Sequence, residues 1–156
     1  MPAPIPTQSF TVPTEWVDYN GHMNMGFYVV AFDFKATDPM YAWLGLGEDY
    51  IAERNMSVFS ISSRTDYLAE MFEGDTATID TMMLDFDGRR MHYFHQMYNA
   101  AGKVTATNEL VAINVDLEHR KSAPVPDDLA DKIRQVVAAH SFLTRPRHVG
   151  RKIGLR

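Results

Sequence analysis

The sequence contains no cysteine, which excludes disulfides, thiolate zinc sites, Fe–S clusters and cysteine nucleophiles. It also lacks an apolar run near the roughly 20 residues that a membrane-spanning helix needs. Its first ten residues lack the basic start and apolar centre of a secretory signal. Lys and Arg number 15 against 20 Asp and Glu, whereas a nucleic-acid-binding protein needs a basic face. We therefore expect a cytoplasmic protein that contacts neither membrane nor nucleic acid.

The length of 156 residues fits one domain, and 46% hydrophobic residues is an ordinary globular composition. Charge is uneven, because residues 145–156 contain five Lys and Arg and no acid. We expect a single domain over residues 1–140 and a basic tail over residues 141–156. Two interpretations of this tail stay open: a solvated chain end, or a contact with a polyanionic small molecule.

One segment predicts a buried helix. Asn24 is a good N-cap residue, and residues 25–36 after it are apolar on nearly every face. A helix that is apolar all round is covered all round. Asp38-Pro39 then predicts the start of a second, short helix, which ends at Gly45 or Gly47.

The remaining patterns predict an α+β fold in which a twisted antiparallel sheet wraps around that helix. Asp87-Gly88 is a strong hairpin signal, and residues 126–139 have the pattern of a terminal amphipathic helix. The expected strands are residues 7–12, 56–68, 76–86, 89–99 and 103–116. An open sheet edge is commonly paired with another copy, so we expect a homodimer or homotetramer.

The polar segment before the buried helix contains the candidate catalytic residues. Asp18 offers a base or nucleophile, and His22 offers a hydrogen-bonding imidazole. The free backbone N–H of Met25, at the helix start, is a candidate oxyanion hole. Acyl transfer needs these three parts. A polar turn before an ordinary N-cap explains the same residue types, so both interpretations stay open here.

A family resemblance adds to this picture. Asp18-Tyr19-Asn20-Gly21-His22-Met23-Asn24, with Tyr28, resembles the signature D-x-x-G-H-x-N-x-x-x-Y of hotdog-fold acyl-CoA thioesterases of the 4-hydroxybenzoyl-CoA thioesterase type. Residues 67–75 resemble the family's Y-L-x-P-x-x-x-G-D, with Glu70 where proline is usual. The resemblance covers roughly residues 7–140. It implies the hotdog fold and hydrolysis of an acyl-CoA to free acid and CoA.

The resemblance also implies residue roles. Asp18 would act as nucleophile or as general base on water. The Met25 N–H would polarise the thioester carbonyl, and His22 would orient the substrate or Asp18. The site would lie between two subunits of the homo-oligomer. No cofactor is expected, because the coenzyme A thioester is itself the substrate.

Residues 15–23 further resemble the branch of the family that hydrolyses betainyl-CoA in carnitine breakdown. A trimethylammonium group binds well to aromatic faces, although aromatic residues mostly fill protein cores. Asn24 is one candidate for contact with the acyl group. The aromatic candidates are Trp16, Tyr19, Tyr28, Trp43 and Tyr67.

Arginine binds phosphate through two parallel hydrogen bonds, so Arg89 and Arg90 are candidates for binding the CoA phosphates. Arg64 and the basic tail are further candidates, and a solvated hairpin turn is the alternative for the Arg89-Arg90 pair. The six histidines and scattered acids suggest no metal site. Two other functions remain: a hotdog-fold enoyl-CoA hydratase, whose D-x-N-P-x-H motif lacks its proline here, and a non-catalytic acyl-CoA-binding module.

Overall fold

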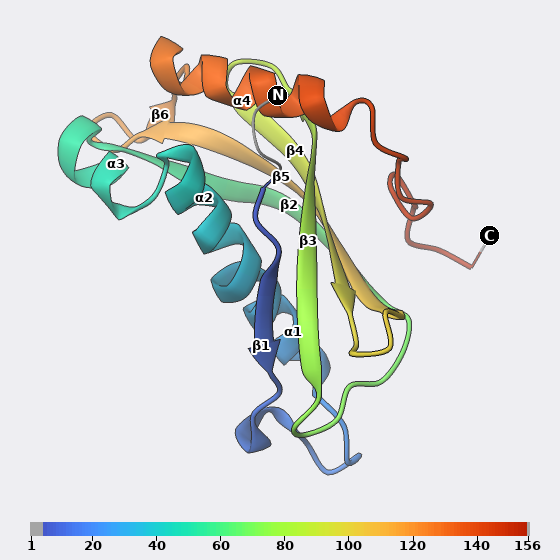
Figure 1. Cartoon of the computed structure of the whole chain (residues 1–156). Helices are drawn as coiled ribbons and strands as arrows, with labels where there is room; N and C mark the ends of the chain where they lie inside the picture. Colours follow the sequence, from blue (N-terminus) through green and yellow to red (C-terminus); the bar gives the residue numbers. More distant parts are fainter. Residues whose placement is uncertain (1–4, 156) are drawn as a thin grey trace.

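The structure is a computed structural model that describes residues 5–155 (Figure 1). Residues 1–4 and 156, at the ends of the expected domain and tail, lie outside the described residues. A curled antiparallel sheet has the strand order β1-β3-β4-β5-β2, and β6 pairs with the end of β5. The strands are β1 (Gln8–Thr11), β2 (Met56–Tyr67), β3 (Thr76–Phe86), β4 (Arg90–Tyr98), β5 (Val104–Asp116) and β6 (Lys121–Ser122). The expected strands are confirmed, and β6 is an addition.

The central helix begins where the sequence predicts. The Asn24 side chain accepts a hydrogen bond of 2.9 Å from the Gly26 N–H and caps α1 (Met25–Phe32). A π-helical turn, η2 (Asp33–Thr37), follows directly and leads into α2 (Asp38–Leu44). The short second helix predicted to start at Asp38-Pro39 and to end at Gly45 is confirmed as α2. It follows η2 without a break, because the backbone of Asp38 is itself helical.

The buried side chains explain why the helix contains a π-turn. One row of buried side chains recurs every four residues, and it consists of Tyr28, Phe32, Ala36, Met40 and Leu44. In a regular helix of 3.6 residues per turn, this spacing would rotate the buried stripe by about 160° over its length. The wider π-turn takes up part of that rotation, so one stripe faces the sheet throughout. Gly45, at φ +86°, ends the helix.

Two further helices complete the fold. The amphipathic α4 (Asp127–His140) is close to expectation, whereas the short α3 (Glu48–Arg54) was not expected. One hydrophobic cluster joins α2 and α4 to the sheet, and a second joins α1 to β1 and the start of β3. No helix in the described part of the chain has the length and apolarity to cross a membrane. The cytoplasmic location stays a prediction.

The central helix is covered on one side only, which corrects the expectation of burial on every face. The sheet curls around one side of α1 and α2, and the other side stays open within this chain (Figure 1). Met25 and Phe34 remain 64% and 61% exposed. On the neighbouring edge strand β2, Ile61 is 55% exposed. An apolar helix face and an apolar sheet edge thus lie together, uncovered by the chain itself.

Candidate active site

The loop that carries Asp18 is held against the start of α1 by backbone hydrogen bonds. The Asn24 N–H donates to the Trp16 carbonyl at 2.9 Å, and the Met23 N–H donates to the Met71 carbonyl at 2.7 Å. Gly21 takes a φ of +79° at the tip of the turn, a conformation that glycine adopts without strain. The loop therefore places the Asp18 carboxylate beside the first residues of the helix.

Asp18 is held as a carboxylate by two donors. Its Oδ2 accepts from the Asn24 side-chain amide at 2.7 Å, and its Oδ1 accepts from the Asn20 N–H at 2.8 Å. These hydrogen bonds, that of Asn24 first, lower the pKa of Asp18 below its ordinary value. An ionised carboxylate at neutral pH is the form that attacks a carbonyl or takes a proton from water.

The backbone N–H of Met25 is a free donor next to this carboxylate. It is the first N–H of the helix, and no acceptor among residues 5–155 takes it. The partial positive charge at a helix start adds to its pull on a developing oxyanion. Asn24 links the two groups, because its amide nitrogen holds Asp18 while its oxygen caps the helix.

A cavity of about 370 Å³ opens beside Met25. Tyr28 and Tyr67 meet edge to face in its wall, with ring centroids 5.3 Å apart. The Tyr67 hydroxyl donates to the Met25 carbonyl at 3.2 Å, which ties β2 to the helix start. We call this space the acyl cavity; its lining residues are His22, Met23, Met25, Tyr28, Tyr67, Leu68, Ala69 and Glu70.

His22 lines the acyl cavity but is turned away from Asp18. Its Nδ1 donates to the Met23 carbonyl at 3.0 Å, and its Nε2 lies 3.9 Å from a Glu70 carboxylate oxygen. Among the described residues, the only hydrogen bond between His22 and Asp18 joins their backbones, from the Asp18 N–H to the His22 carbonyl at 3.2 Å, and their side chains are not hydrogen-bonded to each other. Of the two roles expected for His22, contact with substrate therefore fits the geometry, while Asn24 orients Asp18.

Three of the five expected aromatic contacts lie outside the acyl cavity. The Trp16 indole stacks on Phe27 at 5.3 Å and meets Phe10 at 5.8 Å, so it is partly buried against the core cluster around α1. Tyr19 is 97% exposed at the loop tip. Trp43 packs in the other core cluster, under the Lys132 ammonium. Only Tyr28 and Tyr67 of the predicted aromatic group come together.

Arg89 and Arg90 lie at the opposite end of the sheet from Asp18. They follow the β3–β4 hairpin, whereas the Asp18 loop adjoins the start of β3, on the order of 30 Å away along the strand. Arg90 pairs with Asp87 at 2.7 Å, and Arg89 donates to the Ser122 carbonyl at 3.0 Å. Within one chain these two arginines stabilise the hairpin and do not reach the acyl cavity.

Glu70 is the site residue that our interpretation of the sequence missed. Its carboxylate is the one acidic group that lines the acyl cavity in the described chain, and its charge raises the pKa of Tyr28 after the larger effect of burial. The signal in the sequence that could have identified it is that Glu70 stands where the family usually has proline.

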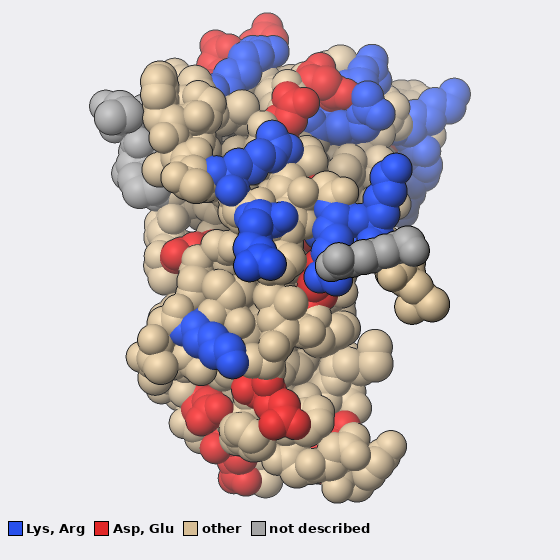
Figure 2. All heavy atoms as spheres, turned by 90° about the vertical axis from the view of Figure 1, so that its right-hand side faces the viewer, with Lys and Arg blue, Asp and Glu red and all other residues tan. Residues whose placement is uncertain are grey.

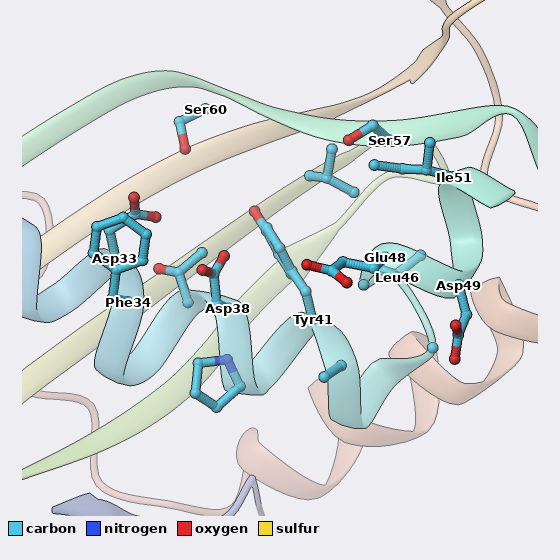
Figure 3. A pocket seen from close by; sticks show the side chains of 16 residues that line it. Asp33, Phe34, Asp38, Tyr41, Leu46, Glu48, Asp49, Ile51, Ser57 and Ser60 are labelled. Atoms are coloured by element: carbon cyan, nitrogen blue, oxygen red, sulfur yellow. The ribbon is translucent and has the colours of Figure 1, made fainter.

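A second hollow, of about 670 Å³, lies farther along the helix toward α3 (Figure 3). Asp33 and Asp38 point from the helix toward the part of β2 that holds Ser60, and Ser57 lies farther along that strand, near Ile51 (Figure 3). Burial and the nearby acids raise the pKa of Asp38. This hollow contains none of the predicted site residues and opens on the uncovered face that carries Phe34.

The comparisons with known proteins point to one family. Residues 12–133 match the family model described as the thioesterase-like superfamily. A betainyl-CoA thioesterase of Pseudomonas aeruginosa is 33% identical over 96% of this chain and 94% of its own. An L-carnitine dehydrogenase/betainyl-CoA thioesterase of Ruegeria pomeroyi is 34% identical over 96% of this chain, which spans 30% of that longer protein.

Solved structures agree with this result. A putative thioesterase of Pseudomonas putida superposes with a TM-score of 0.84, at 31% identity over 99% of both chains. A Staphylococcus aureus protein studied in complex with CoA gives a TM-score of 0.87, at 25% identity over 96% of this chain and 94% of that one.

The chain belongs to the thioesterase-like superfamily. The curled sheet around a central helix is the hotdog fold, and the expected family, fold and enzyme class, an acyl-CoA thioester hydrolase, are confirmed. The individual roles of the site residues stay predictions.

Proposed function

We propose that this chain hydrolyses betainyl-CoA, without a cofactor, in the acyl cavity. The observation that carries the proposal is that one cavity joins a helix N–H, two tyrosine rings and a carboxylate. The betainyl-CoA thioesterase of Pseudomonas aeruginosa, which is similar over nearly the whole chain, supports the same substrate.

The proposed reaction uses the groups around the start of α1. The thioester oxygen accepts from the Met25 N–H, which stabilises negative charge as the carbonyl is attacked. Asp18 either attacks the carbonyl carbon itself or takes a proton from a water that does so. In the first route the C–S bond breaks as an anhydride forms between Asp18 and the acyl group, and a water then hydrolyses this anhydride. In the second route the oxygen of water forms the C–O bond as the C–S bond breaks. In both routes a proton from water ends on the CoA thiolate, and the products are free acid and CoA.

The charge of the betainyl group matches the wall of the acyl cavity. Its trimethylammonium is one methylene away from the thioester carbonyl, so a carbonyl at Met25 places the cation in the same cavity. The Glu70 carboxylate offers opposite charge there. The rings of Tyr28 and Tyr67 offer the π-faces that attract a desolvated cation.

We also propose that the active enzyme is a homodimer or homotetramer, in which a second copy covers the open face. The edge strand β2 has unpaired backbone groups, and its exposed Ile61 lies near the exposed Met25 and Phe34 of the helix. Since Met25 and Tyr67 border both this face and the acyl cavity, a second copy would help to close the cavity.

A free-thiol release assay on betainyl-, acetyl-, benzoyl- and palmitoyl-CoA tests the function. We expect selective release from betainyl-CoA and a 10²–10⁴-fold loss of kcat in Asp18→Asn, the usual size of a general-base contribution. Asp87→Asn, a carboxylate change at the far hairpin, is the matched control and should keep full activity. Hydration of an enoyl-CoA without thiol release, or CoA ester binding without turnover, would refute the proposal.

Glu70→Gln tests the substrate separately from the mechanism. It keeps the size of the side chain and removes its charge, so KM should rise for betainyl-CoA and stay constant for any uncharged acyl-CoA that the enzyme accepts. An equal change for charged and uncharged substrates would remove Glu70 from acyl recognition.

The oligomer is tested by light scattering on Ile61→Lys, which places a charge on the β2 edge. We expect smaller particles and lower activity than in Phe142→Lys, a control at an exposed apolar residue after α4. A wild-type enzyme that is active as a monomer would refute the proposed assembly.

A further inference from the structure

The described part of the basic tail lies against the sheet, on the side opposite α1 and α2 (Figure 1). After α4, the C-terminal segment (residues 141–155) reaches β5 and then β2. The Arg64 guanidinium, on β2, donates to the carbonyl of His148 at 2.5 Å and also to the carbonyl of Arg151. The Gly150 N–H donates to the Glu109 carboxylate of β5 at 2.9 Å.

The groups that anchor this segment already compensate one another's charge. Arg64 lies 2.9 Å from Glu109 and 3.4 Å from Asp66, and the three side chains are only 12–17% exposed. His92 adds a contact to Glu109 at 2.8 Å. Arg64, one of the expected phosphate contacts, is thus occupied by two carboxylates and two carbonyls. Its role is to position the C-terminal segment.

The basic side chains of the C-terminal segment, in contrast, have no compensating charge among residues 5–155. Arg147, Arg151 and Lys152 are exposed, and none of them forms an ion pair with a residue of the described chain. Together with Leu68 they line a hollow of about 1090 Å³. Figure 2 shows that most Lys and Arg side chains of this side lie in the upper two thirds of the molecule.

Leu68 connects this hollow to the acyl cavity, because it lines both. A ligand whose reacting end lies beside Met25 therefore has an apolar exit past Leu68 toward three uncompensated cations. CoA has this layout: a thioester at one end, an uncharged pantetheine arm, and a diphosphate and a 3′-phosphate at the other end.

We infer that Arg147, Arg151 and Lys152 bind the phosphate groups of CoA. The inference rests on the proposed function of the acyl cavity. It assigns to the tail the task that the sequence pattern suggested for Arg89 and Arg90, which lie at the other end of the sheet. Arginine and lysine both favour phosphate oxygens, and three cations match the several charges of the CoA phosphates.

Calorimetry with CoA itself tests this subsite. The variant is Arg147→Gln/Arg151→Gln/Lys152→Gln, which removes three charges and keeps the backbone carbonyl that Arg64 holds. We expect its Kd for CoA to rise at least about tenfold, or about 1.4 kcal/mol, with an unchanged Tm. The matched control is Arg89→Gln/Arg90→Gln, which should bind CoA like the wild type. An equal Kd in the wild type and the tail variant would overturn the inference.

A second measurement separates binding of phosphate from support of the fold. The same acyl group on pantetheine lacks the phosphates, so the tail variant should hydrolyse it with the wild-type kcat/KM. A loss of this activity would overturn the inference, because the tail would then act on the acyl cavity itself. A wild type that binds CoA and hydrolyses no thioester would refute the proposed function and leave the phosphate subsite standing.

Discussion

Replacing Asn24 separates the stability of the central helix from the ionisation of Asp18. The Asn24 oxygen accepts from the Gly26 N–H at 2.9 Å, and its amide nitrogen donates to Asp18 at 2.7 Å. Asn24→Ala removes both bonds. Loss of an N-cap costs about 1 kcal/mol, which for a chain of this size lowers Tm by about 2–4 °C. Asn24→Ser keeps a capping oxygen and removes the amide donor, so its Tm should stay near that of the wild type.

The pKa of Asp18 should respond in both variants. The Asn24 hydrogen bond is the largest cause that lowers this pKa in the folded protein, so its loss moves the pKa upward, toward the ordinary value of 3.8. The stabilisation linked to this carboxylate is present above the ordinary pKa and is lost as pH falls through the folded pKa. A carboxyl NMR titration measures the shift directly, alongside thermal unfolding.

The kcat values of the two variants show whether Asn24 supports activity by positioning Asp18 or only by stabilising the helix. If Asn24 holds Asp18 in its reactive orientation, kcat falls in Asn24→Ser as much as in Asn24→Ala, although only the alanine variant loses stability. An Asn24→Ser enzyme with an unchanged Asp18 pKa and full kcat would refute the reasoning.

Two further predictions concern stability. Burial lowers the pKa of His95 to about 3, so the unfolded chain binds a proton that the folded chain rejects. The stability due to His95 should fall as pH drops from about 6.5 toward 3, by up to about 1.4 kcal/mol per pH unit. Urea titrations of His95→Gln should therefore show a smaller pH slope than those of the wild type, in which His140, whose pKa burial also lowers, adds to the slope. Gly45→Ala should lower Tm more than Gly74→Ala: both residues have positive φ, but a Cβ at Gly45 would lie 3.0 Å from Leu129 whereas one at Gly74 meets nothing. Equal Tm values would contradict the second prediction.

Features that depend on neighbouring residues could be predicted from the sequence. Asn24 caps the helix because its side chain reaches an N–H two residues away. Asp87 and Gly88 form the hairpin because the Asp87 carboxylate accepts from the N–H groups of Arg89 and Arg90 within the turn. Each signal and its effect lie within a few residues, so no knowledge of the fold is needed.

Features that depend on distant residues could not be predicted in the same way. Pro39 favours a helix start locally, but burial of Met40 and Leu44 in the same stripe as Phe32 keeps the helix continuous. Trp16 has the chemistry of a cation contact, but its stacking on Phe27 holds it against the core cluster and outside the acyl cavity.

The residues that contact the CoA phosphates could not be predicted locally either, because their place depends on the course of the whole sheet. Arg89 and Arg90 have the right charge, but the course of β3 sets them at the far end from Asp18. The sequence pattern of the tail fits either a solvated chain end or a polyanion contact. Its anchoring depends on Arg64, far away in the sequence, so no local pattern could decide between the two.

The π-turn at Asp33–Thr37 has a consequence for the comparison of this chain with its relatives. A π-turn holds one residue more than the α-helical turn that it replaces, so it has the form of a single-residue insertion accommodated within a helix. A relative that lacks the π-turn is expected to be one residue shorter between Phe32 and Asp38. An alignment without a gap there would set Met40 and Leu44 opposite residues on another face of the helix. The alignment gap therefore belongs inside the central helix, although gaps are normally not placed within helices.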